Sequence, residues 1–445
     1  MIRDAGFAVP SFTVPVIAAP DVCVVGGGAA GVAAAVGAAR CGMSVLLIER
    51  YGFCGGATVA GLSGTICGLY SSGERPEQIV FGFAGEFCDR LRARGGVASS
   101  VPFGRTRLLP HDSFTWKETA DSLLAAAGVE VLFHTNFVRA YTGDAGEVRT
   151  LLLRAMEGLV AVQPRAVVDA SGDAEVVAGA GLPATFGKDG VVQTPTMVFR
   201  AGGVDMPVFL GLDPREINMR VARAHAAGKY DLPRHHVYLF PMPMGREVLC
   251  NMTRITYPDG SVPCGISSAG ISFAEQEGRR QARRYASFLK ECVPGFENSY
   301  LVETGAQVGI RQSRSIAARL RLSNQDVLEG RKHPGAATFS AWPIECHSSA
   351  GLTISYLEGD AYDIPFETLI PAGSINLLAA GRCLCAEHEA LASARVTAQC
   401  FGMGYAAGAA CGLMRKENLK ADALTGEMVA YWMRRNGLKT TGEAE

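Results

Sequence analysis

The sequence predicts an α/β protein, in which a Rossmann-like domain is split in sequence by an inserted, mixed-sheet domain. A strand, a glycine-rich turn, a helix and a second strand follow one another within residues 21–49, the order and length of a β-α-β unit. A similar strand leading to glycine returns at Ile375–Gly381. Glycine supplies 53 of the 445 residues, which indicates many tight turns and close backbone approaches.

Composition excludes several classes of protein. The chain is 48% hydrophobic and 19% charged, as expected of a folded chain and not of a disordered one. Its 42 basic and 43 acidic residues give a net charge of −1, so no basic field is present to hold nucleic acid. The 13 cysteines are scattered without a C-x-x-C pair, which favours reduced thiols and a cytoplasmic location.

Neither a signal peptide nor a membrane span is expected. Arg3 and Asp4 are followed by no clean apolar stretch, as a signal peptide would require. Residues 22–39 are uncharged, but Gly26–Gly28 and Gly31 interrupt them. We therefore expect the chain to be soluble.

The first domain is predicted to occupy residues 1–184, beginning with a loose, proline-containing arm over residues 1–20. Alternating apolar and polar runs bounded by turn residues define its elements. The expected elements are strands at Asp21–Val25, Ser44–Glu49, Val129–Phe133, Val148–Arg154, Leu159–Val162 and Arg165–Ala170, and helices at Ala29–Cys41 and Phe114–Ala127.

The remaining boundaries follow changes in the apolar pattern. Residues 185–365 are predicted to form the inserted substrate domain, with proline-containing turns and one long basic helix at Ser272–Glu291. Residues 366–415 return to the first domain with a strand at Ile375–Ala380 and a small-residue helix at Ala394–Leu413. Residues 416–445 are polar and are predicted to be a peripheral tail.

The strongest motif is the G-x-G-x-x-G of Gly26, Gly28 and Gly31, which directly follows a strand and opens a helix. The first glycine makes the tight turn, the second admits a pyrophosphate to the backbone, and the third lets helix and strand pack closely. Glu49 ends the second strand, where a carboxylate accepts ribose hydroxyl groups. The motif predicts a dinucleotide site without distinguishing NAD from FAD.

Later segments distinguish the cofactor. With the fingerprint, they resemble the bacterial FAD-dependent oxidoreductases of the glutathione-reductase structural class, over about residues 20–413. The segments are Glu49-Arg-Tyr-Gly-Phe-Cys-Gly-Gly56, Asp169-Ala-Ser-Gly-Asp173, Gly309-Ile-Arg-Gln-Ser-Arg314, Ala380-Gly-Arg-Cys383 and Gly402-Met-Gly-Tyr-Ala-Ala-Gly408.

The resemblance implies a Rossmann-like FAD-binding domain and its contact residues. Phe137 and Val138 would offer backbone to adenine, and a helix starting near Gly402–Gly404 would direct its positive end at the flavin. Relatives with an acidic residue after the late glycine differ from this chain, which has Arg382 there. The expected FAD contacts are Gly26, Gly28, Ala29, Ala30, Gly31, Glu49, Arg50, Gly55, Gly56, Ala57, Val138, Ser171, Gly172, Asp173, Gly381, Arg382, Arg395, Gly402, Met403 and Gly404.

Two motifs of related flavoproteins are absent from the sequence, which reduces the number of reactions to consider. Disulfide reductases of this class carry a C-x-x-x-x-C pair after the Gly-Gly, where this chain has Thr58 and Ser63, so dithiol chemistry is disfavoured. No second strand–G-x-G-x-x-G–helix unit is found for NAD(P)H. Cys54, beside the Gly-Gly, is expected to be a small buried side chain and not a covalent flavin attachment.

Four residues are candidates for catalysis. His388 lies between a cofactor strand and a cofactor helix, and a neutral imidazole there would take a proton from an alcohol or amine. Glu345 and His347 are alternatives, for which ordinary loop polarity is equally good an interpretation. Arg311, with Arg314, would clamp a substrate carboxylate, although a solvated helix face is an equal alternative.

The sequence therefore predicts an FAD-dependent dehydrogenase or oxidase. It would transfer hydride from a small polar metabolite (an alcohol, an amine or a saturated C–C bond) to flavin, which oxygen or another acceptor would reoxidise. A flavin monooxygenase and a non-catalytic FAD-binding electron-transfer or assembly protein are the alternatives. No metal site is expected, since His235 and His236 lack ligands at metal spacing, and homo-oligomerisation is left open.

Overall fold

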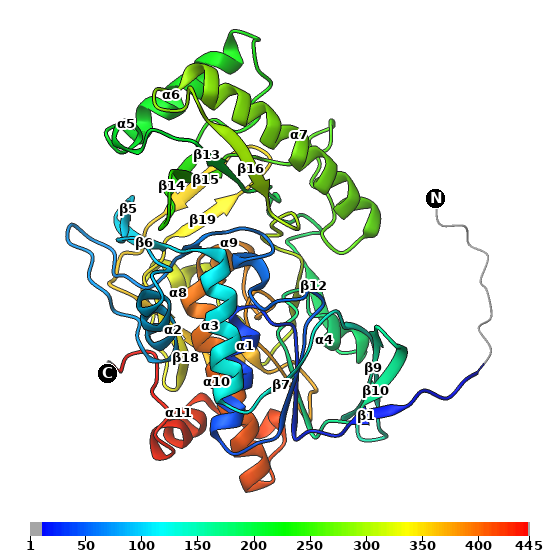
Figure 1. The fold of residues 1–445 in the computed structure, drawn as a ribbon. Coiled ribbons are helices and arrows are strands. Elements are labelled where there is room, and N and C mark those ends of the chain that lie inside the picture. Colours follow the sequence, from blue (N-terminus) through cyan, green and yellow to red (C-terminus); the bar gives the residue numbers. More distant parts are fainter. Residues whose placement is uncertain (1–10, 444–445) are drawn as a thin grey trace.

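A five-stranded parallel sheet organises the lower part of the molecule (Figure 1). The computed structural model describes residues 11–443. The strand order, β22-β11-β2-β3-β7, is that of a doubly wound sheet. Its strands read as continuous apolar runs because both faces are covered. They are β2 (Val22–Val25), β3 (Val45–Ile48), β7 (Glu130–Leu132), β11 (Ala166–Asp169) and β22 (Leu377–Ala379).

Three helices cover one face of this sheet: α1 (Ala29–Arg40), α3 (Ser113–Ala126) and α10 (Thr397–Glu417). The axes of α1 and α10 approach closely because small residues line their contact. A Cβ on Gly404 or Gly408 would lie 2.0 Å from the carbonyl oxygen of Ala30 or Ala34, respectively. The alanine- and glycine-rich sequence of both helices is therefore a requirement of packing.

A second sheet covers the opposite face and shares a buried apolar core with it. Its order is β1-β10-β9-β8, in which β1 pairs parallel to β10 and the other pairs are antiparallel. The strands are β1 (Val16–Ala18), β8 (Asn136–Thr142), β9 (Val148–Ala155) and β10 (Gly158–Val162).

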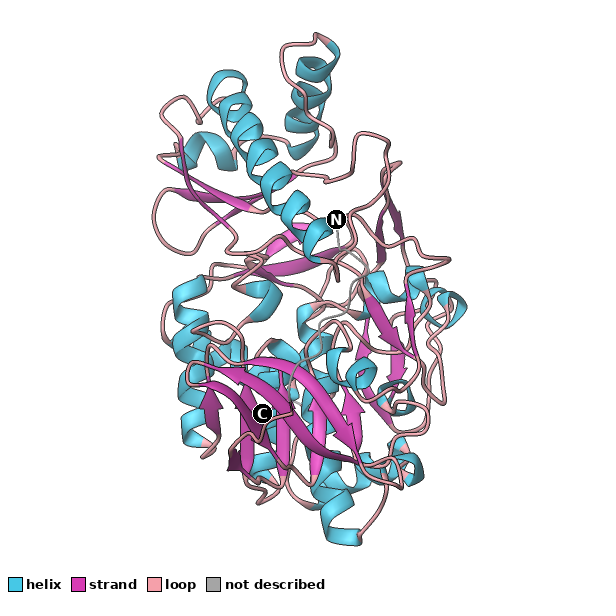
Figure 2. Ribbon diagram, turned by 90° about the vertical axis from the view of Figure 1, so that its right-hand side faces the viewer, coloured by secondary structure: helices cyan, strands magenta, loops and turns pink. Residues whose placement is uncertain are grey.

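The inserted region builds a separate antiparallel sheet, in the order β14-β15-β13-β16, covered by the long helix α7 (Ser268–Cys292). Figures 1 and 2 show this unit above the layered sheets. A small apolar core that includes Leu62, Phe103 and Trp342 joins the two parts. The strands are β13 (Phe199–Gly202), β14 (Tyr238–Pro241), β15 (Glu247–Asn251) and β16 (Tyr300–Thr304).

Short elements complete the chain. Two of the strand pairs, β19 with β20 and β12 with β17, lie between the inserted sheet and the first domain. The short elements are η1 (Gly56–Thr58), β4 (Thr65–Ile66), α2 (Gly82–Ala93), β5 (Val101–Phe103), β6 (Thr106–Pro110), α4 (Glu175–Gly179), β12 (Ala184–Phe186), α5 (Met206–Leu210), α6 (Pro214–Ala226), β17 (Arg314–Ile316), α8 (Asn324–Leu328), β18 (Ala336–Ser340), β19 (Ile344–His347), β20 (Leu352–Ser355), β21 (Tyr362–Pro365), η2 (Phe366–Leu369), α9 (His388–Ala394), η3 (Ala421–Ala423) and α11 (Gly426–Arg435).

The predicted β-α-β unit, the helix over Phe114–Ala127 and the long inserted helix are confirmed to within a few residues. The helix predicted at Ala394–Leu413 is wrong at its start. There α9 ends at Ala394, and α10 begins only at Thr397. Gly402 therefore lies inside α10, past its first turn.

The predictions for the two ends of the chain need correction. The arm was predicted over residues 1–20, of which residues 1–10 lie outside the described range. Within residues 11–20, Val16–Ala18 forms the strand β1. The predicted peripheral tail is instead part of the core, because Leu424, Val429 and Met433 are buried with α10. Val429 and Met433 share one face of α11, a periodicity that the polar composition of the segment obscured. Residues 444–445 lie outside the described range.

No helix within residues 11–443 combines the length and the apolar character that crossing a membrane requires.

The α1–α10 contact gives the first prediction. Gly408→Ala should lower the free energy of unfolding by about 1–3 kcal/mol, because the new methyl group overlaps the Ala34 carbonyl. The thermal midpoint, Tm, should fall accordingly. Gly211→Ala is the matched control, since a Cβ there meets nothing nearer than 3.5 Å, and it should change stability by less than about 0.5 kcal/mol. Equal Tm values for the two variants would contradict the packing argument.

Candidate active site

A cavity follows the carboxyl ends of β2, β3 and β11, at the point where the strand order reverses and open α/β sheets bind ligands. We call it the dinucleotide cradle. Segments from every part of the first domain, and one from the inserted region, meet there. Its lining includes Gly26, Gly28, Ala29, Ala30, Glu49, Arg50, Gly55, Gly56, Ala57, Thr58, Thr135, Asn136, Phe137, Ser171, Gly172, Gln307, Gly381, Arg382, Arg395, Thr397 and Cys400.

The glycine turn after β2 shapes the centre of the cradle. A Cβ on Gly31 would lie 1.7 Å from the carbonyl oxygen of Gly26, so only glycine lets α1 begin so close to the strand. By contrast, a Cβ on Gly28 would meet nothing nearer than the Cα of Gly56, at 3.9 Å. Gly28 caps α1 without a side chain, so the first-turn N–H groups remain free to bind a phosphate.

Glu49 both holds the turn and faces the cradle. Its Oε2 accepts a hydrogen bond from the backbone N–H of Gly27 at 2.6 Å, and its Oε1 accepts one from Tyr51 at 2.9 Å. The side chain is only 5% exposed, and burial raises the pKa of Glu49 against the effect of these bonds. Each oxygen keeps a further lone pair, so the carboxylate can accept ribose hydroxyl groups.

Asp169 fixes the turn after β11. Its Oδ1 accepts hydrogen bonds from the N–H and hydroxyl of Ser171, and its Oδ2 accepts from the N–H groups of Val176 and Val177, at 2.8 and 3.0 Å. The Asp-Ala-Ser-Gly-Asp segment is thus a structural cap for α4. Ser171 and Gly172 line the cradle as a result.

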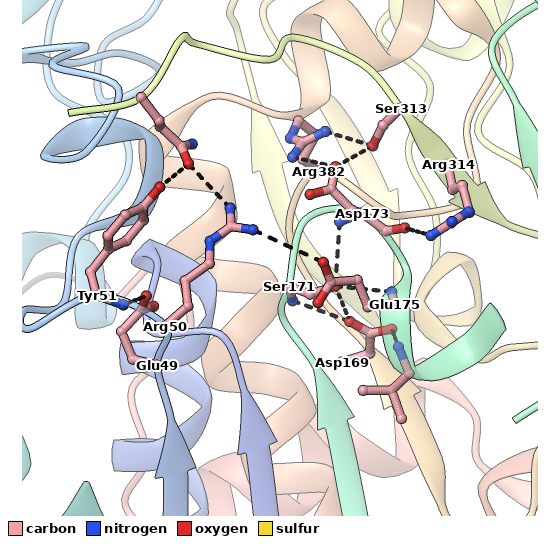
Figure 3. A network of polar contacts seen from close by, with 12 residues as sticks. Glu49, Arg50, Tyr51, Asp169, Ser171, Asp173, Glu175, Ser313, Arg314 and Arg382 are labelled. Carbon is pink, nitrogen blue, oxygen red and sulfur yellow. Dashed lines mark hydrogen bonds and ion pairs between the residues drawn. The ribbon is translucent and has the colours of Figure 1, made fainter. Parts of the chain in front are cut away.

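Arg382 joins three distant segments of the chain (Figure 3). Its guanidinium donates to Asp173 Oδ1 and to Ser313 Oγ, both at 2.8 Å. Arg314 donates to the backbone carbonyl of Asp173 at 3.1 Å. Burial raises the pKa of Asp173, but Arg382 and Ser313 outweigh it and hold that pKa below its usual value. Arg382 is therefore engaged as the partner of Asp173, and it also lines the cradle.

Arg50 and Tyr51 form the outer rim of the cradle. Both donate to the side-chain oxygen of Gln307, which comes from the inserted region. Arg50 also lies 4.0 Å from Glu175. Burial, together with the charge of Asp173, raises the pKa of Glu175 to about 7. The rim is thus a contact between the first domain and the inserted region.

Most residues expected to contact the cofactor line the cradle, and six do not. Gly31 is one of the six, because it packs against the Gly26 carbonyl. Val138 is 49% exposed and faces a neighbouring groove with Asp173. Gly402, Met403 and Gly404 lie within α10, and Gly404 packs on α1. The start of α10 that lines the cradle is at Thr397 and not near Gly402–Gly404.

Several lining residues were not predicted. Thr397 and Cys400 line the cradle because α10 starts at Thr397, directly after its N-cap residue Val396. Thr58 belongs to the 3-10 turn after the Gly-Gly pair. Gln307 comes from the inserted region, and no local pattern in the sequence signals its contact with Tyr51.

Glu345 and His347 are brought together on β19. They lie two residues apart in the strand, so their side chains share one face. His347 Nε2 is 3.1 Å from Glu345 Oε1. Burial, with the nearby positive charges of Arg311 and Arg234, lowers the pKa of His347 well below its usual value. The neutral ring is thus favoured, and in the tautomer that donates Nε2–H to Glu345 its Nδ1 carries the lone pair.

Arg311 and Arg395 approach the same pair. Arg311 is 7% exposed and donates to the carbonyl of Thr194 at 2.7 Å, so the alternative of a solvated helix face is wrong. Arg395 donates to Gln193 at 3.2 Å and lines the cradle. Burial raises the pKa of Glu345, while Arg311 and Arg395 oppose that rise.

His388 lies at the start of α9, half-buried. Its Nδ1 has no hydrogen-bond partner among the described residues, and burial lowers its pKa. Gln193 donates to its backbone carbonyl at 3.3 Å. His388 thus lies beside the Arg395 segment but is not oriented by a carboxylate, as His347 is.

Cys54 is buried behind Gly27, where a Cβ would lie 2.8 Å from the cysteine Sγ. Burial raises the pKa of the Cys54 thiol, as expected for an inert buried cysteine. Within residues 11–443, no cluster of three or more His, Cys, Asp or Glu side chains is arranged to hold a metal ion.

Comparison with known proteins gives the family. The family profile described as FAD dependent oxidoreductase matches residues 21–431. No curated protein sequence matches the chain. Among solved structures, it is similar to a geranylgeranyl bacteriochlorophyll reductase-like protein from Thermoplasma acidophilum, at 14% identity and a TM-score of 0.48, over 94% of this chain and 83% of that one. It is also similar to the p-nitrophenol 4-monooxygenase PnpA from Pseudomonas putida DLL-E4, at 14% identity and a TM-score of 0.43, over 68% and 70% of the two chains.

The cofactor is FAD, and the cradle fits it. Gly28 leaves open space beside the N–H groups of the first turn of α1 for a pyrophosphate. Glu49 offers carboxylate lone pairs for ribose. At the other end, Arg395 and the first turn of α10 line the cradle, where the positive helix end favours negative charge. The buried Nε of Arg395 has no acceptor among the residues that the structure describes, as expected beside a polar ligand.

The open space at Gly28 gives the second prediction. Gly28→Asp should weaken FAD binding at least about a hundredfold, because a carboxylate would occupy the phosphate position. The measurement is the visible flavin absorbance per protein after gel filtration. Gly211→Asp introduces the same charge where a Cβ meets only ordinary contacts and should keep its FAD. A Gly28→Asp protein that stays as yellow as the control would refute the assignment.

Proposed function

We propose that this chain, which belongs to the FAD dependent oxidoreductase family, oxidises a small polar metabolite by two electrons. FAD supplies the acceptor for a hydride from a substrate C–H bond. The substrate's O–H or N–H proton would pass to the protein, and the electrons would leave to molecular oxygen or another acceptor. We also propose that the chain is related to the glutathione-reductase structural class.

One observation carries the proposal. A hydrogen-bonded carboxylate–imidazole pair, Glu345 and His347, lies within electrostatic reach of Arg395, which itself lines the cradle. β19, which holds the pair, lies between the inserted sheet and α9 (Figure 1). Such an interface between two domains is where enzymes commonly bind small molecules.

The pair is suited to accept a proton. Glu345 receives the Nε2–H of His347 and so fixes both the tautomer and the orientation of the ring. The surrounding arginines stabilise the ionised form of Glu345. His347 Nδ1 would then take the substrate proton as the C–H bond breaks. We prefer His347 to His388 because only His347 has a carboxylate partner.

The test is anaerobic bleaching of the purified FAD-bound protein by a panel of alcohols, amines and hydroxy acids. Bleaching by one of these without NAD(P)H supports the proposal. Bleaching that requires NAD(P)H, followed by insertion of oxygen into the substrate once air is admitted, would replace it with a monooxygenase reaction. No bleaching by any compound in the panel would favour a non-catalytic flavoprotein.

The third prediction distinguishes the two histidines. His347→Gln should keep FAD but slow substrate-dependent flavin bleaching about 10²–10⁴-fold, because the proton acceptor is lost. His388→Gln is the matched comparison and should bleach within about tenfold of the unchanged protein. Stopped-flow absorbance measures both rates. The reverse order of effects would assign the proton transfer to His388.

The fourth prediction concerns pH. Burial and the neighbouring arginines hold the pKa of His347 well below its usual value. A proton acceptor works only when unprotonated, so the bleaching rate should stay level from pH 8 down to about 6, below the usual histidine pKa of about 6.5. In Arg311→Met, the loss of a positive charge should raise that pKa and move the acidic decline upward. A decline centred at about 6.5 in the unchanged protein would contradict the assignment.

A further inference from the structure

Three arginines, of which Arg234 and Arg311 are buried and Arg395 is half-buried, act electrostatically on a single carboxylate near the cradle. We call Arg234, Arg311 and Arg395, together with Glu345, the arginine cluster. Arg234 is 1% exposed and Arg311 is 7% exposed. They come from the inserted region, while Arg395 comes from the junction of α9 and α10. The tertiary fold thus gathers charges from three distant segments.

The charges of the cluster do not balance. The three guanidinium groups carry three positive charges, and Glu345 carries one negative charge. The closest ion-pair contact of Glu345 is with His347, at 3.1 Å, which is neutral. Arg254 lies close enough to add a further positive influence on Arg234. Within residues 11–443 no carboxylate lies within ion-pair distance of the three arginines, and buried charge is costly unless it is paired.

The pKa values report the same imbalance. Burial, with Arg234 and Arg395, lowers the pKa of Arg311 well below its usual value. Burial also lowers the pKa of Arg234 and of Arg395, and Glu345 only partly offsets this. Arginine does not deprotonate in proteins. The shifts therefore indicate a strained positive site that an anion would relieve.

Unused hydrogen-bond donors lie in the same place. Arg234 donates to the carbonyl of His236 at 2.7 Å and to Asn251 at 2.8 Å, but its buried Nη2 has no partner within residues 11–443. Arg395 Nε and the hydroxyl of Tyr238 are likewise buried and unpartnered in that part of the chain. The Arg234 guanidinium lies 5.3 Å from the Tyr238 ring. Unpaired buried donors of this kind are expected where a ligand accepts from them.

We propose that the arginine cluster binds the carboxylate of an anionic substrate, which makes the metabolite oxidised here a carboxylic acid. This rests on the proposed function. A carboxylate matches the forked donors of arginine, supplies the missing charge and satisfies the free guanidinium N–H groups. Arg395 belongs to both the cluster and the cradle, so an anchored acid presents its neighbouring carbon to the cofactor and to His347.

The experiment measures binding and needs no turnover. FAD-bound protein is titrated with acetate and benzoate, and with acetamide and benzamide as uncharged counterparts of the same shape, up to about 50 mM so that millimolar affinities are seen. At least one carboxylate should raise Tm saturably, and its amide should not. No saturable rise with either carboxylate, or equal rises with the amides, would overturn the proposal.

Variants locate the binding. Arg311→Met should weaken carboxylate binding about 10–100-fold while keeping FAD, because a charge-assisted contact is lost. Arg215→Gln removes the same charge from an exposed side chain that pairs with Asp213 on α6 and should bind as before. An FAD-bound Arg311→Met protein with unchanged binding would overturn the proposal. If Arg311→Met loses its FAD, the charge-retaining Arg311→Lys takes its place, and a response unchanged in Arg311→Lys overturns the proposal too.

The two proposals fail separately. If carboxylates bind but no metabolite bleaches the flavin, the anion site stands and the proposed oxidation is wrong. If uncharged substrates bleach the flavin but carboxylates do not bind, the proposed oxidation stands and the anion site is wrong.

Discussion

The close approach of α1 to the end of β2 is the constraint on which the rest of the site depends. Gly31 lies against the Gly26 carbonyl at a distance that admits no side chain, and this contact sets where the helix begins. The free N–H groups of its first turn therefore lie beside the open space at Gly28. The same small-residue surface continues along α1 to Gly404 and Gly408 of α10, so packing that stabilises the domain also brings α10 to the other end of the cradle.

Two sets of polar contacts then join this rigid centre to the inserted region. The Asp173–Arg382 ion pair with Ser313 ties the turn after β11 to the turn after β22 and to the returning inserted chain. The rim contact of Arg50 and Tyr51 with Gln307 does the same at the outer end. Because both contacts are hydrogen bonds with defined directions, the position of the inserted sheet relative to the cradle is set by directional bonds as well as by apolar packing.

The proposed substrate side is arranged differently from the cofactor side. The cradle presents backbone and small residues, whereas the facing region holds Glu345, His347 and an excess of buried positive charge. Such charge disfavours the folded state unless it is paired, and it keeps His347 neutral. One physical feature, the density of arginine, therefore bears both on proton transfer and on the kind of molecule that the site would accept.

The sequence by itself determined the local parts: the β-α-β unit, the glycine turn, Glu49 and the late strand, because each depends on neighbours within about 30 residues. It also singled out Arg311, Glu345, His347 and Arg395, but as separate candidates. Only the tertiary structure decided that these lie near one another, that Arg234 joins them, that Gln307 reaches Tyr51 at the rim of the cradle, and that α10 starts at Thr397. Contacts between segments hundreds of residues apart leave no periodic pattern in either segment, since they arise from how sheets and helices stack after each has formed.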